Sequence, residues 1–318
     1  MTKKVQILID PSHSSWILGG LFSEISEIYP EFFSKPIEVY NLKNRRYVKS
    51  IFLVFLLALK KSPILFSSIT PLQNYLKINP FKTNKIILWF THSEGVPSKK
   101  TVKLLNKSDL IFVHSDNLKL QLSSFGVTSK KVTTIGAINP LYFKTSPTPG
   151  NKIAWIGTAV ARKNPEMLLK FANQNRDLNF KVLGSNWRYT EIFARLSQLP
   201  NVEYVEINKQ IKSSDLDLCS HFLMLSTVEG GPITLLEALA AGLIPICTPV
   251  GIAPELLPKI GYKKQLLISN YTLESIRQKY ETPYSNNHRL KASKFAKSFT
   301  INRLGLLINN EIQNYLVD

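Results

Sequence analysis

The chain has 318 residues, 44% of them hydrophobic and 19% charged, and this composition excludes a disordered protein. Its length is large for one hydrophobic core and fits two domains, while two cysteines are too few for a disulfide framework. A formal net charge of +18 predicts an acidic partner: a nucleic acid, an anionic membrane surface or a phosphorylated small molecule. The alternative is a solvated, lysine-rich surface without such a partner.

The first half of the chain alternates short apolar runs with helical segments. The strand-length runs are Val5–Asp10, Pro63–Ser68, Ile86–Thr91, Leu110–Ser115 and Val132–Gly136. We expect a loop with Gly19 and Gly20 after the first run, and a helix from about Leu21. Near-continuous apolar strands separated by helices indicate a parallel sheet covered on both faces. The N-terminus lacks an apolar segment long enough for a signal peptide, so we expect a cytoplasmic protein.

One segment between the first two runs is apolar on every face of a helix. Ile51–Leu59 contains nine consecutive apolar residues, far fewer than the roughly 20 that a membrane-spanning helix needs. Basic residues flank it: Arg45, Arg46, Lys49, Lys60 and Lys61. Such a helix is either fully enclosed by the sheet and its neighbours, or lies in the interface of an anionic membrane and presents a lipid-linked acceptor.

A second alternating pattern begins after the proline-rich segment Thr145–Gly150, which is the best candidate for a linker. Its strand-length runs are Lys152–Gly157, Phe180–Gly184, Val202–Val205, Phe222–Ser226 and Ile244–Cys247. We therefore predict two doubly wound, Rossmann-like α/β domains, residues 1–146 and 147–297. Ligands of such sheets bind beyond the carboxyl ends of the strands. Three loops, at Gly19–Gly20, Gly157 and Glu229–Gly231, are thus expected to line one cleft between the domains.

The segment S-T-V-E-G-G-P-I-T-L-L-E-A-L-A-A-G, Ser226–Gly242, places one glutamate before an apolar helix and one inside it. Pro232 fits the first helical position and Gly242 a C-terminal stop. A buried carboxylate is costly without a partner, so Glu237 requires one. The alternative for the two glutamates is a solvated Glu229 and a Glu237 that accepts a hydrogen bond from a neighbouring backbone N–H.

The start of this helix is also a candidate anion site. Gly230 and Gly231 precede it, and the backbone amides of Ile233 and Thr234 are suitable donors at its positive end. A diphosphate bound there would bring the glutamates beside a sugar nucleotide. An ionised carboxylate accepts hydrogen bonds from two sugar hydroxyls, so paired glutamates suit such a ligand.

These residues carry a resemblance to a known family. The segment L-S-T-V-E-G-G-P-I-T-L-L-E-A-L-A-A-G-L-I-P-I-C-T-P-V-G-I-A-P-E-L-L, Leu225–Leu257, resembles the E-x7-E region of retaining glycosyltransferases of family GT4, which have the GT-B fold. I-A-W-I-G-T-A-V-A-R-K-N-P-E-M-L-L, Ile153–Leu169, is similar to the family's strand-Gly-Arg-x4-Lys segment. K-S-D-L-I-F-V-H-S and I-N-P-L-Y-F resemble the end of its N-terminal domain, and Gly19-Gly20 its first glycine loop.

The resemblance implies roles for several residues. Glu229 would contact the transferred sugar near its reacting carbon, Glu237 would hold the ribose, and Lys163 would neutralise the donor diphosphate as charge develops on it. His92 is placed like a histidine that touches the donor sugar. Thr158 stands where the family has an arginine, and Arg162 is the candidate substitute. The final helix, 298–318, would pack back on the first domain.

We therefore expect a GT-B glycosyltransferase that transfers a sugar from a nucleotide-diphosphate donor, a UDP- or GDP-sugar, to a glycan, polysaccharide or lipid-linked acceptor. The family needs neither metal nor cofactor, and the protein would work in the cytoplasm or peripherally on the inner face of the membrane. Two alternatives stay open: an inert binding subunit of the same fold, which Thr158 favours, and a sugar-nucleotide epimerase. A nucleic-acid partner is disfavoured, since the basic residues are dispersed without a recognition motif.

Overall fold

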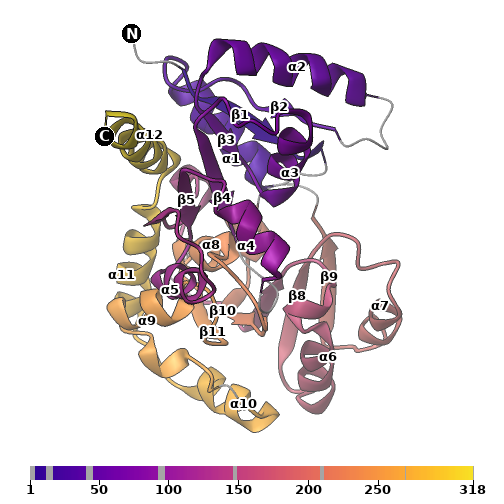
Figure 1. The fold of residues 1–318 in the computed structure, drawn as a ribbon. Coiled ribbons are helices and arrows are strands. Elements are labelled where there is room, and N and C mark those ends of the chain that lie inside the picture. Colours follow the sequence, from indigo (N-terminus) through magenta and orange to yellow (C-terminus); the bar gives the residue numbers. More distant parts are fainter. Residues whose placement is uncertain are drawn as a thin grey trace. The chain divides into compact units, whose positions relative to one another are not determined.

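The structure, a computed structural model, describes residues 4–11, 17–40, 46–91, 97–145, 149–207, 211–268 and 270–317. The chain divides into two compact units (Figure 1). Unit 1 comprises Met1–Ile135 together with Ile301–Asp318, and unit 2 comprises Gly136–Thr300. The proposed linker, Thr145–Gly150, falls within unit 2 and lies partly outside the described residues.

Unit 1 is built on a six-stranded sheet in the order β2-β1-β3-β4-β5-β6, with every neighbouring pair parallel. Its strands are β1 (Gln6–Ile9), β2 (Ile37–Glu38), β3 (Ile64–Phe66), β4 (Ile86–Phe90), β5 (Leu110–Val113) and β6 (Lys130–Thr133). Its helices are α1 (Ile17–Ile28), α2 (Tyr47–Lys60), α3 (Ile69–Ile78), α4 (Lys99–Leu105), α5 (Asp116–Ser124) and α12 (Ile301–Val317). Every residue of β3, β4 and β5 is buried, which explains their unbroken apolar sequence.

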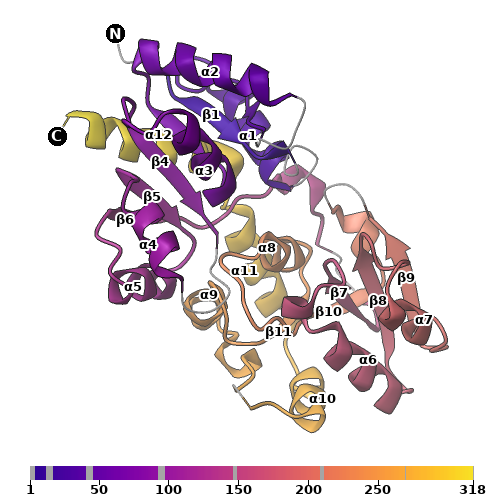
Figure 2. The same cartoon turned by 45° about the vertical axis from the view of Figure 1, so that its right-hand side comes forward.

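Unit 2 contains a five-stranded parallel sheet in the order β11-β10-β7-β8-β9 (Figure 2). Its strands are β7 (Lys152–Ile156), β8 (Asn179–Gly184), β9 (Val202–Glu206), β10 (Cys219–Met224) and β11 (Ile244–Cys247). Its helices are α6 (Pro165–Gln174), α7 (Glu191–Leu196), α8 (Ile233–Ala240), α9 (Ala253–Lys259), α10 (Leu273–Glu281) and α11 (Asn286–Lys297), and its 3₁₀ turns are η2 (Pro140–Tyr142), η3 (Ala161–Lys163), η4 (Ser213–Leu216) and η5 (Lys263–Gln265). The two parallel sheets confirm the predicted α/β class.

Two local predictions about helix starts are wrong. Gly19 and Gly20 lie in the first turn of α1, which begins at Ile17, rather than in a loop before it. Glycine disfavours helix, but burial of Leu21, Phe22 and Ile25 outweighs that preference. Pro232 is the residue before α8, with ψ of 109°, rather than its first residue.

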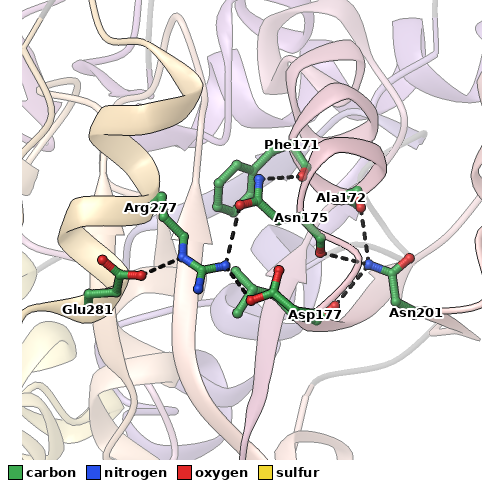
Figure 3. A network of polar contacts seen from close by, with 8 residues as sticks. Phe171, Ala172, Asn175, Asp177, Asn201, Arg277 and Glu281 are labelled. Carbon is green, nitrogen blue, oxygen red and sulfur yellow. Dashed lines mark hydrogen bonds and ion pairs between the residues drawn. The ribbon is translucent and has the colours of Figure 1, made fainter.

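A polar network fixes the end of α6 and connects it to α10 in unit 2 (Figure 3). The side-chain amide of Asn201 donates to the carbonyl oxygens of Ala172, Asn175 and Leu178, at 3.1, 3.1 and 2.9 Å. The Ala172 carbonyl lies in the last turn of α6, where helical N–H groups no longer reach it, and the other two follow the helix. The Asn175 carbonyl also accepts the backbone amide of Leu178 at 3.1 Å. Arg277 of α10 donates to the Asp177 carboxylate at 2.7 Å in the same turn. The network therefore holds helices around the sheet that carries the candidate site.

Candidate functional site

The candidate site lies at the point where the strand order of unit 2 reverses. The chain runs outward from β7 through β8 to β9, and then returns to β10 on the other side of β7. Loops that follow β7 and β10 therefore flank the crevice in which open α/β sheets bind their ligands. Lys163 belongs to the first of these loops and Glu229 to the second.

Glycines shape the loop after β7. A Cβ on Gly184 would stand 1.8 Å from the carbonyl oxygen of Gly157, so only glycine allows the ends of β7 and β8 to approach this closely. The same carbonyl accepts a hydrogen bond from the indole of Trp187 at 2.8 Å. The chain then forms η3 and enters α6 with Pro165 in the first turn. Arg162 and Lys163 thus stand on a short, fixed turn.

A buried ion cluster joins the two loops. The Oε1 atom of Glu229 lies 2.5 Å from Lys163 Nζ and 3.2 Å from Arg162 Nη1, and only 7% of the Glu229 side chain is exposed. The backbone amide of Thr227 also donates to the Arg162 carbonyl at 2.8 Å. The alternative of a solvated Glu229 is therefore wrong, because the cations of the β7 loop draw its carboxylate inward.

The electrostatics of the cluster keep Glu229 charged. Burial alone would raise the pKa of this carboxyl, but Lys163, Arg162 and a hydrogen bond from Ser226 together hold it below its usual value. Glu229 is thus an ionised acceptor at neutral pH. Ser226 had no predicted role, and no pattern in the sequence marks it.

The segment after β11 packs against the loop that carries Gly230 and Gly231. Gly251 has φ of +58°, and a Cβ there would stand 2.4 Å from the carbonyl oxygen of Gly230. The hydroxyl of Thr248 donates to the Ser226 carbonyl at 2.6 Å. The close approach of Gly251 to Gly230 gives a structural reason for the glycine in the V-G-I-A-P-E segment, whose role the sequence did not reveal.

Glu237 has the opposite environment from Glu229. It lies on α8 with 1% of its surface exposed, and neither carboxylate oxygen has a hydrogen-bond partner within the part of the chain that the structure describes. The alternative in which it accepts a backbone N–H is therefore wrong. Burial without a partner raises the pKa of this carboxyl to about 8. A buried polar group without a partner requires an explanation, and a role in ligand binding is one.

The remaining predicted residues divide by location. Gly230, Gly231, Ile233 and Thr234 form the end of the loop and the start of α8, where the first amides of the helix have no intrahelical acceptor. Gly19 and Gly20 lie in α1 of unit 1, and their place in a cleft with this cluster of unit 2 stays a prediction. His92 lies outside the described residues. Among the described residues, no group of three or more His, Cys, Asp or Glu side chains is placed to hold a metal ion.

Comparison with known proteins gives one family match, over the unit that holds this ion cluster. Residues 143–299 match the family model described as Glycosyl transferases group 1. The match lies within unit 2. No curated protein is significantly similar to the whole sequence.

Solved structures of low identity share the fold of the chain. Anabaena Alr3699/HepE in complex with UDP has a TM-score of 0.75 at 12% identity, covering 98% of this chain and 100% of its own. Sucrose-phosphate synthase from Thermosynechococcus elongatus has a TM-score of 0.74 at 13% identity, and the match covers 99% of this chain and 100% of the synthase. The lipopolysaccharide outer core galactosyltransferase WaaB has a TM-score of 0.72 at 13% identity, and the match covers 98% of this chain and 99% of WaaB. The fold is thus GT-B, as predicted.

Proposed function

We propose that the protein is a retaining glycosyltransferase, which moves a sugar from a nucleotide-diphosphate donor to a glycan, polysaccharide or lipid-linked acceptor. The buried carboxylate of Glu237, without a partner on the helix that follows the ion cluster, carries this proposal. Two ribose hydroxyls would supply the hydrogen-bond partners that its oxygens lack. A UDP-sugar is the first donor to test, because HepE shares this fold and its structure holds UDP.

The ion cluster would receive the donor diphosphate. Its oxygens would accept hydrogen bonds from the amides of Ile233 and Thr234 and pair with Lys163 and Arg162. Those cations now contact Glu229, so the diphosphate would compete for them and free Glu229 to accept hydrogen bonds from the transferred sugar. Arg162 would supply the positive charge that Thr158 cannot.

The chemistry follows from this placement. The bond between the anomeric carbon and the β-phosphate oxygen breaks, and the acceptor oxygen bonds to that carbon on the same face. The acceptor proton passes to the departing diphosphate. Lys163 and Arg162 stabilise the charge that develops on the leaving group, and we propose that these cations suffice without a metal ion. Glu229 orients the sugar and forms no covalent bond to it.

The test is a thermal-shift titration with UDP-, GDP- and ADP-sugars. A ligand that binds the native state raises the melting temperature with occupancy. One donor should stabilise the wild type and the matched control Glu166→Gln, whose glutamate lies on the exposed side of α6, but not Glu237→Gln. Equal stabilisation of Glu237→Gln, or none of the wild type, would contradict the proposal.

An inert binding subunit of the same fold is the second candidate, and Thr158 at the family's arginine position favours it. Turnover separates the candidates. A transferase releases free nucleoside diphosphate only when acceptor is present, an epimerase converts the donor without acceptor, and an inert subunit does neither. The anomeric configuration of the product, read by NMR, tests retention.

A further inference from the structure

Helix α2 presents an apolar face to solvent. Six large apolar side chains on this helix are between 37% and 72% exposed: Val48, Ile51, Phe52, Phe55, Leu56 and Leu59. Their spacing repeats every three or four residues, so they form one continuous stripe along the helix. The alternative of a fully enclosed helix is therefore wrong.

The opposite face of α2 anchors the helix in unit 1. Val54 and Leu57 are buried in the core with residues of α3, and the Ser50 hydroxyl accepts a hydrogen bond from the Tyr40 amide at 2.9 Å. The Asn84 side chain donates to the Leu57 carbonyl at 2.8 Å, near the end of the helix. Figures 1 and 2 both show α2 at the outer edge of unit 1. The exposed stripe is thus a fixed surface of the folded unit.

The charged residues of α2 and of its two ends are all basic. Lys49 and Lys60 are exposed and about three helical turns apart, so they lie along the same edge of the stripe. Arg46 and Lys61, at the two ends of the helix, are also exposed, and α2 contains no acidic residue. Arg45 lies outside the described residues. A contiguous apolar face with a basic border marks an interaction surface.

We propose that this face, which we call the α2 face, docks the protein on an anionic lipid bilayer. The apolar stripe would enter the boundary between headgroups and acyl chains, and Lys49 and Lys60 would contact anionic headgroups. A second copy of the chain fits less well, because pairing two such faces brings the same lysines together. No described helix is long and apolar enough to cross a membrane, so the binding would be peripheral. The proposal does not depend on the donor chemistry of unit 2.

The test is co-sedimentation of the full chain with two kinds of vesicle, phosphatidylcholine alone and phosphatidylcholine with an equal part of phosphatidylglycerol. We expect the wild type to bind the anionic vesicles at least about tenfold more tightly than the neutral ones. Phe52→Ser/Phe55→Ser should weaken this binding at least about tenfold, and Lys49→Glu/Lys60→Glu at least about twentyfold. All four side chains are exposed, so circular dichroism and melting temperature should match the wild type.

Matched variants separate the α2 face from general charge and hydrophobicity. Leu120→Ser/Leu141→Ser changes two exposed apolar residues on other helices, and Lys170→Glu/Lys291→Glu makes the same change in net charge on unit 2. Both should bind within about twofold of the wild type. Loss of binding in either control to the same extent as in the α2 variants would overturn the proposal. Equal binding of the wild type to anionic and neutral vesicles would also overturn it.

Two further measurements examine the face itself. The fluorescence of Phe55→Trp should shift to shorter wavelength on anionic vesicles and stay unchanged on neutral ones, because the indole leaves water. An unchanged spectrum with bound protein would show that another surface makes the contact. Sedimentation velocity without lipid should give a monomer, whereas a dimer that Phe52→Ser/Phe55→Ser abolishes would assign the face to self-association and refute lipid docking.

Discussion

Replacing Glu237 with glutamine should stabilise the free protein. The carboxyl of Glu237 has a pKa of about 8 in the folded chain, against its usual 4.5. Between these two values the unfolded chain releases a proton that the folded chain keeps. The unfolded state is therefore favoured increasingly as pH rises, and wild-type stability falls through this window. Glutamine has a similar shape and no charge, so it removes this dependence.

The magnitude follows from the shift. One pKa unit corresponds to about 1.4 kcal/mol, so the burial of Glu237 destabilises the fold by about 3 kcal/mol at about pH 7 and about 5 kcal/mol above about pH 8. Near about pH 5 the cost is under about 1 kcal/mol, and the two proteins should be similarly stable. The variant would gain stability while it loses the proposed ribose contact.

Urea unfolding at about pH 5, 7 and 8 measures this difference. Tryptophan fluorescence is a suitable signal, because Trp155 and Trp187 are buried in the core of unit 2. The stability gap between Glu237→Gln and the wild type should widen by just over about 1 kcal/mol per pH unit. The exposed Glu166→Gln should show no such trend. A gap that stays constant over this range would refute an ionisable, partnerless Glu237.

Lys163→Met should lower kcat by about a hundredfold, since it removes charge beside the proposed leaving group, and it should also lower the melting temperature, since Glu229 loses the nearer of its two cations; a kcat loss under about fivefold would speak against that role. Gly184→Ala places a methyl group 1.8 Å from the Gly157 carbonyl oxygen, so urea unfolding should show a loss of about 3 kcal/mol, and a wild-type transition would disprove the close approach. Asn201→Ala removes the side-chain donor of three carbonyl groups, of which Asn175 keeps the Leu178 amide, and should cost about 3 kcal/mol. Arg277→Met should cost no more than about 1 kcal/mol, because the Asp177 partner is largely exposed; the reverse order of these two losses would contradict this account of the network.

The fold was predictable because its buried parallel strands leave an unambiguous pattern. The strand Ile244–Cys247 has the predicted bounds, since all of its residues are buried and none is charged. The two-residue strand β2 (Ile37–Glu38) was missed, because it is too short to form an apolar run. The start of α1 was missed for a different reason. Local propensity places glycine outside a helix, whereas the packing of the next turn decides where the helix begins.

The sequence singled out the residues of the candidate site, but it could not predict their contacts. The spacing of Glu229 and Glu237 marked both as unusual, yet it could not show that one is paired and the other has no partner. A backbone hydrogen bond from Thr227 to Arg162, which are distant in the sequence, joins the two loops of the ion cluster. Likewise, the uniform apolar run of α2 does not reveal which face meets the core. Only packing distinguishes Val54 from Phe55.

Helix α12 has a consequence for the order in which the protein is made. It belongs to unit 1, where the Tyr29 hydroxyl donates to the Asn302 carbonyl at 3.1 Å and a Cβ on Gly305 would meet the Tyr29 ring at 2.6 Å. The ribosome synthesises all of unit 2 before this helix. Because domains tend to fold as they leave the ribosome, unit 2, a continuous segment, can fold as soon as it is synthesised. Helix α1 cannot pack against α12 until the rest of the chain has been synthesised. In the nascent chain, the surface of α1 that α12 later covers would therefore be accessible to a chaperone that binds exposed apolar side chains.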